Sequence, residues 1–177
     1  MFEKQKTIGE GCDYATLEEA FEKAPAGTHL LIKPGEYHFD HELVFNKSFA
    51  LQTDDDEKLA TLIAPSIKFN MEPSCFAVFS RVNFDGYCQF LNGCTASFEV
   101  CDFTSKKTDE NAIITVNNSA PTFRFCKFHD FPKYGIDYVE GRGGICTDCE
   151  FVNIGCEGDP IKITLPSRPF HEHNKKL

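Results

Sequence analysis

A six-residue pattern of apolar and variable positions recurs four times along this chain. Each copy begins with an apolar residue, which is followed by two variable residues, Cys or Val, one further variable residue and then Phe. The copies are Phe79–Phe84, Phe98–Phe103, Phe123–Phe128 and Cys146–Phe151. Their final Phe residues stand at 84, 103, 128 and 151, so successive copies are 19, 25 and 23 residues apart. This period is typical of the coils of a β-helix and is too short for a propeller blade.

Each copy of the pattern predicts a bend followed by a short strand. The Cys or Val and the final Phe are two residues apart, so they point to the same side of a strand. The two variable residues before the Cys predict a tight bend. Stacking the copies predicts three interior columns with rungs about 4.8 Å apart. These columns are Phe79, Phe98, Phe123 and Cys146; Val82, Cys101, Cys126 and Cys149; and Phe84, Phe103, Phe128 and Phe151.

A second family of apolar segments follows the repeat at a similar offset. Its members are Ala112–Val116, Gly135–Val139 and Asp159–Thr164. One coil cannot bury its own apolar side, so only a stack of coils is stable. We therefore predict an all-β fold, a parallel β-helix of about six or seven coils, as a single domain over residues 1–164.

The segment before the repeats predicts a short helix and several strands. Thr16 and Glu19 form a capping box, and Leu17, Phe21 and Ala24 belong to one apolar stripe, so we expect a capping helix at 16–24 over the first coil. Pro25–Gly27 ends this helix. Further short strands are expected at 29–33, 36–40, 43–45, 48–52, 60–63 and 67–69.

The end of the chain predicts an open coil. Pro166 and Pro169 stop strand addition, and we expect residues 165–177 to form a loose C-terminal tail. No second amphipathic helix is available to cover Ile161 and Ile163. Either the tail folds back over this end or another protein chain covers it, and end-to-end self-association is one form of the second alternative.

Composition limits the class of protein. The 177 residues carry a formal net charge of −9, which argues against nucleic acid or an anionic membrane as the partner. No apolar run approaches the roughly 20 residues of a membrane span, and Met1–Lys6 does not match a signal peptide. The nine cysteines fall mostly on the interior columns, where free Cys is a small apolar residue. We expect a reducing, cytoplasmic setting without disulfides.

Two sets of motifs resemble known β-helix proteins. Tyr14–Ala20, Lys33–Tyr37 and Phe49–Gln52 resemble the entry segment of pectin-lyase-like right-handed β-helices. Ala120–Asp130 and Gly144–Asn153, together with Tyr134–Ile136, are similar to the CASH-type repeats of eukaryotic F-box substrate receptors. The resemblance covers about residues 12–164. It implies that the predicted β-helix is right-handed and that the motifs have a structural role. Because no F-box-like segment precedes the repeats, it implies no direct ubiquitin-ligase role.

The signatures of carbohydrate-active β-helices are missing from the chain. Asp102–Ser105 is the nearest match to the Asp-Phe-Ile-Phe-Gly strand of pectinesterase-like enzymes, and the Trp-containing segment of that family cannot occur without Trp. Thr53–Asp55 lies in a loop before the repeats, and the Gly-His-Gly motif of polygalacturonase-like enzymes is absent. The acidic run Asp54–Asp56 is typical of a solvated loop. We predict that the protein is not an enzyme and has no catalytic residue.

Two further groups have a chemical interpretation and a structural one. Cys146 and Cys149 have the spacing of half a zinc site, with Cys156, His171 or His173 as the remaining candidate ligands. The interior columns account for both cysteines, so we expect no metal and no cofactor. His129 and Asp130 follow the repeat at a turn position, where we expect no catalytic dyad.

The bend positions carry the clearest functional signal. Arg81, Val100, Phe125 and Asp148 are expected to stack on the outside, and two of these four are apolar. Contiguous exposed apolar surface marks protein contacts. The alternative is that this bend packs against a loop of the same chain. The candidate partner-contact residues are Val100, Phe125, Phe131, Tyr134, Ile161 and Ile163.

The sequence therefore predicts a non-catalytic structural or protein-interaction module, working with a protein partner and acting as a subunit of a larger assembly. The alternative function is a carbohydrate-binding or carbohydrate-cleaving protein of the pectin-lyase-like group. An ice-binding β-helix needs regular arrays of Thr, which this chain lacks.

Overall fold

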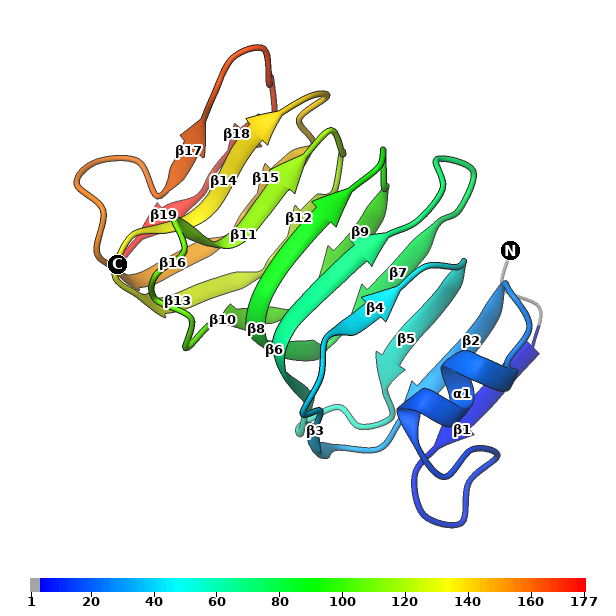
Figure 1. Ribbon diagram of the computed structural model, residues 1–177. Coiled ribbons are helices and arrows are strands. Elements are labelled where there is room, and N and C mark those ends of the chain that lie inside the picture. The colour runs from blue at the N-terminus through cyan, green and yellow to red at the C-terminus, as the bar shows by residue number, and fades with distance from the viewer. Residues whose placement is uncertain (1–3) are drawn as a thin grey trace.

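The computed structural model describes residues 4–177 and confirms the predicted parallel β-helix (Figure 1). Every strand pair in this range is parallel, because equivalent segments of successive coils lie side by side. The first sheet has eight strands, so the solenoid has about eight coils rather than the six or seven predicted. The prediction missed the first and last coils, because no strand was expected at residues 4–8 and residues 165–177 were assigned to a loose tail.

The first sheet forms one long side of the solenoid. In spatial order its strands are β1 (Lys4–Ile8), β2 (Thr28–Ile32), β5 (Phe49–Thr53), β7 (Ala77–Ser80), β9 (Ala96–Glu99), β12 (Thr122–Arg124), β15 (Ile145–Thr147) and β18 (Phe170–Glu172). The outward and inward residues of these strands alternate, so that each outward residue of β12 has an outward partner in β9 and in β15.

The second sheet has eleven strands and is bent along its length. Its strands are β3 (Gly35–His38), β4 (Leu43–Phe45), β6 (Ala60–Asn70), β8 (Val82–Leu91), β10 (Asp102–Thr104), β11 (Ala112–Asn117), β13 (Lys127–Phe131), β14 (Tyr134–Glu140), β16 (Glu150–Ile154), β17 (Ile161–Ile163) and β19 (Lys175–Lys176). The long strands β6 and β8 run around the corner, since the first part of β6 pairs with β3 and its last part with β4. The second sheet thus supplies two sides of the central coils, whereas the first coil contributes no strand to it and the last contributes only β19.

A single short helix, α1 (Leu17–Lys23), is found among the described residues and confirms the predicted capping helix. The Thr16 hydroxyl accepts from the amide of Glu19 (3.2 Å), and the Glu19 carboxylate accepts from the amide of Ala15 (2.8 Å). Phe21 packs on the interior rings of Phe45 and Phe49, with centroids 5.0 and 5.1 Å away. The helix therefore continues the apolar interior at the N-terminal end, beside β1 and β2 (Figure 1).

The three interior columns lie where the repeat predicts them. Phe84, Phe103, Phe128 and Phe151 are paired in register from coil to coil, with ring centroids 5.0, 5.1 and 4.8 Å apart. Each of these rings is at most 1% exposed. Burying one Phe side chain contributes roughly 1.5–3 kcal/mol, so the columns supply much of the stability of the fold.

Six of the nine cysteines are buried and belong to the same interior. They are Cys88, Cys94, Cys101, Cys126, Cys146 and Cys149. Burial raises the pKa of the Cys94 thiol to about 12 and also raises the pKa of Cys126. A protonated, enclosed thiol is a weak nucleophile and a poor metal ligand, so Cys94 and Cys126 serve as interior residues.

Part of the predicted loose tail forms two short strands. Residues 170–172 form β18, which pairs with β15, and residues 175–176 form β19, which pairs with β16. The prolines do not prevent this pairing, because both precede β18 and neither replaces a donor within it.

Within residues 4–177, no helix is long and apolar enough to cross a membrane.

Candidate functional site

The bend between the two sheets repeats one backbone conformation in five coils. Its outer residue has a positive φ each time, between +52° and +59°, at Arg81, Val100, Phe125, Asp148 and His173. The amide of Val100 donates to the carbonyl of Arg124 (3.1 Å), and the amide of Phe125 to that of Thr147 (3.3 Å). The bend therefore keeps the backbone ladder intact and points these side chains outward, as predicted.

Two of these five bend residues are poorly suited to their backbone conformation. The left-handed region costs an L-residue about 1–2 kcal/mol, and it is least compatible with a β-branched side chain such as that of Val100. Val100 and Phe125 are also 46% and 58% exposed, so burial does not compensate for this strain. Strain kept at an exposed apolar position is more typical of a contact site than of a stabilising feature.

A shallow depression of about 360 Å³ lies beside Phe125. Its apolar lining comes from Phe125, Ile145 and Phe170, and its polar lining from Arg124, Thr147, Asp148, Glu172 and His173. Phe170 is 53% exposed and is the register partner of Ile145 on the outer face of the first sheet. We call the exposed residues Val100, Phe125 and Phe170, together with the half-buried Ile145, the bend surface.

The structure separates the six predicted contact residues into two groups. Val100, Phe125 and Ile163 are exposed, and Tyr134 is half-buried with the Lys162 ammonium 5.8 Å from its ring centroid. Phe131 and Ile161 were placed wrongly, since they are only 1% and 4% exposed.

Local backbone geometry explains both errors. Asp130 has φ +56°, which breaks the alternation of β13 and returns Phe131 to the interior beside its partner Ile154. Ile161 pairs with Ile136 and continues an interior column of the second sheet. Phe170 was not among the predicted contact residues, because it was assigned to the tail. Ile145 was not singled out, because only the neighbouring Cys146 belongs to the repeat.

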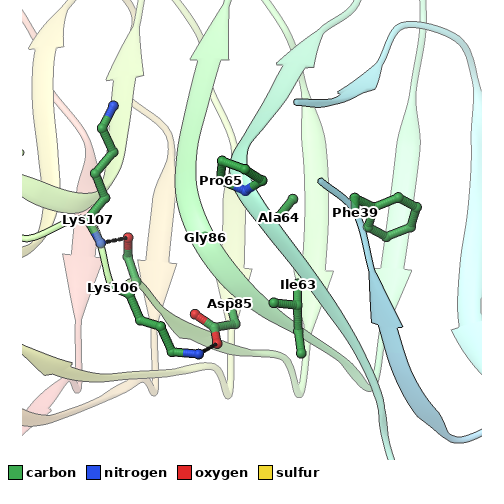
Figure 2. A pocket seen from close by; sticks show the side chains of 9 residues that line it. Phe39, Ile63, Ala64, Pro65, Asp85, Gly86, Lys106 and Lys107 are labelled. Atoms are coloured by element: carbon green, nitrogen blue, oxygen red, sulfur yellow. Dashed lines mark hydrogen bonds and ion pairs between the residues drawn. The ribbon is translucent and has the colours of Figure 1, made fainter. Parts of the chain in front are cut away.

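A second candidate site lies at the corner of the second sheet (Figure 2). A hollow of about 440 Å³ is lined by Phe39, Ile63, Ala64, Pro65, Asp85, Gly86, Ser105, Lys106 and Lys107. Gly86 is required here, because a Cβ at this position would lie 2.4 Å from the carbonyl oxygen of Ala64. In Figure 2 the ammonium of Lys106 reaches back to the Asp85 carboxylate, 3.0 Å away.

A smaller hollow of about 150 Å³ shares Asp85 with the first. Its other lining residues are Thr61, Asn83, Phe84, Asp102, Thr104 and His129. Burial raises the pKa of the Asp102 carboxyl, and in residues 4–177 its side chain has no ion pair or hydrogen bond. Asp102 pairs in register with Asn83, and Asp85 pairs with Thr104, so the two carboxylates are diagonal neighbours on adjacent strands.

The predicted turn at His129 and Asp130 is wrong, because both residues lie within β13; His129 lines the smaller hollow. The Nδ1 atom of His129 is 2.8 Å from the Asp130 carboxylate, which also accepts from the Asn153 amide (2.9 Å). These contacts lower the pKa of Asp130, with the hydrogen bond from Asn153 as the largest cause. The proximity of Asp85 and Asp102 was not predicted, because the register between coils determines which of their residues are neighbours.

The candidate zinc ligands are not assembled into a site. Within residues 4–177, no group of three or more His, Cys, Asp or Glu side chains is placed to hold a metal ion. Cys146 and Cys149 lie in the interior columns, whereas Cys156 belongs to the loop before β17.

Comparisons with protein-family models, with curated proteins and with solved structures find no match. The fold is therefore defined by the coordinates, as a parallel β-solenoid. The likeness of the motifs to pectin-lyase-like and CASH-type β-helices stays a prediction.

Proposed function

We propose that this protein is a non-catalytic β-helix module that binds a protein partner through the bend surface. The observation that supports it is the pair Val100 and Phe125, two exposed apolar side chains held in a left-handed backbone conformation. Asn, Asp or Gly would relieve the strain at these positions. A module that used the bend only to turn the chain would not need large apolar side chains there.

The chemistry of the bend surface indicates what the partner presents. The depression between Phe125 and Phe170 has room for one aliphatic or aromatic side chain. Arg124 and Glu172 lie on its polar side, where the partner can form hydrogen bonds around the apolar contact. Binding sites of this kind combine an apolar anchor with a polar rim. We therefore infer a protein segment with one apolar anchor residue.

Several other features are compatible with this function. The similarity of Ala120–Asp130 and Gly144–Asn153 to CASH-type repeats favours a recognition module that acts as a subunit of a larger assembly. Six buried, unpaired cysteines favour the reducing environment of the cytoplasm.

The test compares the protein with a Phe125→Asp variant as bait in extracts of the native source. Phe125→Asp removes the apolar anchor and suits the φ of +52°. Lys127→Ala is the matched control, because Lys127 points outward from the neighbouring strand β13. A candidate retained by the unmodified protein and by Lys127→Ala is then produced in pure form, and its Kd is measured by calorimetry.

The expected result is a loss of affinity of at least about 30-fold for Phe125→Asp, as for a central contact residue, with an unchanged circular dichroism spectrum. Equal affinities for all three proteins would contradict the proposal. Unfolding of Phe125→Asp would also contradict it, since the side chain would then belong to the interior.

The smaller hollow on the second sheet, which is lined by Asp85 and Asp102, supports a second candidate function, carbohydrate binding or cleavage. Asp85 and Asp102 are diagonal neighbours on adjacent strands and both line the smaller hollow. Glycosidases use a pair of carboxyl groups that flank the scissile bond. Burial raises the pKa of Asp102, as an acid catalyst requires, whereas Asp85 pairs with Lys106.

This second candidate is tested with uncharged and acidic oligosaccharides. Saturation-transfer NMR measures binding, and a reducing-sugar assay measures cleavage. Asp102→Asn is expected to abolish either signal, and Glu150→Gln, an outward residue two rungs farther along the same column, is expected to preserve it. Absence of both signals in the unmodified protein would eliminate the carbohydrate function.

A further inference from the structure

The last coil of the solenoid continues the six-residue repeat with polar residues. His171 is the register partner of Cys146, and Lys176 is the register partner of Phe151. Asn174 follows the positive-φ bend residue His173, as Cys149 follows Asp148. Residues 171–176 are therefore a fifth copy of the repeat in which all three interior positions are polar.

Asn174 binds the backbone of the coil beneath it. Its Oδ1 atom accepts from the amide of Cys149 (2.9 Å), and its Nδ2 atom donates to the carbonyl of Cys146 (2.9 Å). One side chain thereby satisfies a donor and an acceptor on the two sides of the bend. No Cys or Val in the preceding coils can make this pair of bonds, because neither side chain has an amide.

Lys176 closes another part of the same end. Its ammonium donates to the carbonyl oxygens of Cys156 and Gly158, on the loop between β16 and β17. The amides of Lys175 and Leu177 donate to the carbonyls of Cys149 and Phe151 (2.9 and 2.8 Å). Beneath these contacts, the interior residues Cys146, Cys149 and Phe151 are fully buried.

We propose that residues 170–176 cap the interior and thereby prevent a second copy of this chain from adding to the C-terminal end. The coil beneath is the kind of surface on which another coil can stack, because it presents an apolar rung and strands whose next position is free. The polar rung resists stacking, since a second copy would have to desolvate His171, Asn174 and Lys176. This proposal concerns the end of the solenoid and does not depend on the bend surface.

The main test restores the apolar columns in the last coil. The variant His171→Phe/Asn174→Val/Lys176→Phe uses residue types that occupy the same positions in earlier coils. The matched control, Glu172→Ala/His173→Ala/Lys175→Ala, changes only outward positions of the same coil. Sedimentation velocity and light scattering measure the mass of each protein at the same concentrations.

The unmodified protein and the control are expected to have the mass of one 20.0 kDa chain, whereas the restored variant doubles its mass or forms longer assemblies. A folded restored variant that stays monomeric would overturn the proposal. Association of the unmodified protein that is lost when this end is changed would overturn it as well.

A second measurement decides the matter if the restored variant does not fold. Asn174→Ala is a milder change, and hydrogen exchange of its Cys149 amide is compared with that of the unmodified protein. We expect an increase of about tenfold at Cys149, corresponding to one lost hydrogen bond, and no change at Phe123. Equal exchange at Cys149 would show that Asn174 does not cap the coil and would overturn the proposal.

Discussion

The ring of Phe103 stacks on the ring of Phe128 in the next coil, with 5.1 Å between the ring centroids and 9° between the ring planes. The two residues are also Cα partners in the parallel pair of β10 and β13. Backbone pairing therefore determines the ring spacing, and each ring fills the space above the ring before it. A cavity at any one rung consequently removes contacts from the rungs on both sides.

Truncation of Phe128 tests the interior columns. Phe128→Ala is expected to lower the free energy of unfolding by about 3–5 kcal/mol, because it opens a cavity between Phe103 and Phe151. Lys127→Ala, which changes an outward side chain, is expected to shift it by less than about 0.5 kcal/mol. Urea denaturation followed by circular dichroism gives both values, and equal losses would contradict the register.

Relief of strain at the bend is measurable as added stability. Val100→Asn is expected to raise the free energy of unfolding by about 0.5–1 kcal/mol, because Asn tolerates the φ of +53° better than a β-branched residue does. The same substitution is expected to weaken partner binding. If Val100→Asn proves less stable than the unmodified protein, Val100 makes stabilising contacts and the strain argument fails.

The buried carboxyl of Asp102 predicts a dependence of stability on pH. Its pKa is raised by burial above the ordinary value of 3.8, so the protonated form is favoured in the folded state. Its contribution to stability is complete below the unfolded pKa and is lost as the pH rises through the higher folded pKa.

The Asp102→Asn variant isolates this contribution. It is expected to be more stable than the unmodified protein at pH 7, with a difference that disappears below about pH 3.8. Denaturant titrations at a series of pH values measure the difference, and a constant difference across the range would argue against a titrating Asp102.

The cysteines give a prediction about composition. We expect the purified, reduced protein to contain no stoichiometric zinc, because Cys146 and Cys149 occupy interior positions. We also expect its mass to equal the sum of its residues without the loss of two hydrogens per disulfide. Elemental analysis and intact-mass spectrometry check these two points, and one equivalent of zinc would contradict the interior role of the two cysteines.

The fold could be predicted from the sequence because the interior positions of four coils use large apolar residues in a fixed order. The last coil was not predicted, because His171, Asn174 and Lys176 place polar side chains at the positions that are interior in the earlier coils. Phe131 was expected in an exposed loop, whereas it lies in β13, where the positive φ of Asp130 directs it into the interior.

The candidate sites were less accessible to sequence reasoning. Val100 and Phe125 were identified because the bend lies at a constant position within the repeat. The proximity of Asp85 to Asp102 depends on the pairing of β8 with β10, and the repeat alone says little about polar residues on the outer face. The strain at Val100 is a property of the backbone and has no signal in the residue pattern.

In four of the five bends, the backbone amide of the outer residue donates to the next coil, and its side chain takes no part in this hydrogen bond. Arg81, Val100, Phe125, Asp148 and His173 thus differ in size, charge and polarity while the bend geometry stays the same. Substitutions along this line can change what the protein recognises, one coil at a time, without requiring changes in the interior. The outer bend residues serve recognition and the interior residues serve folding, so the two sets of residues can diverge independently during evolution.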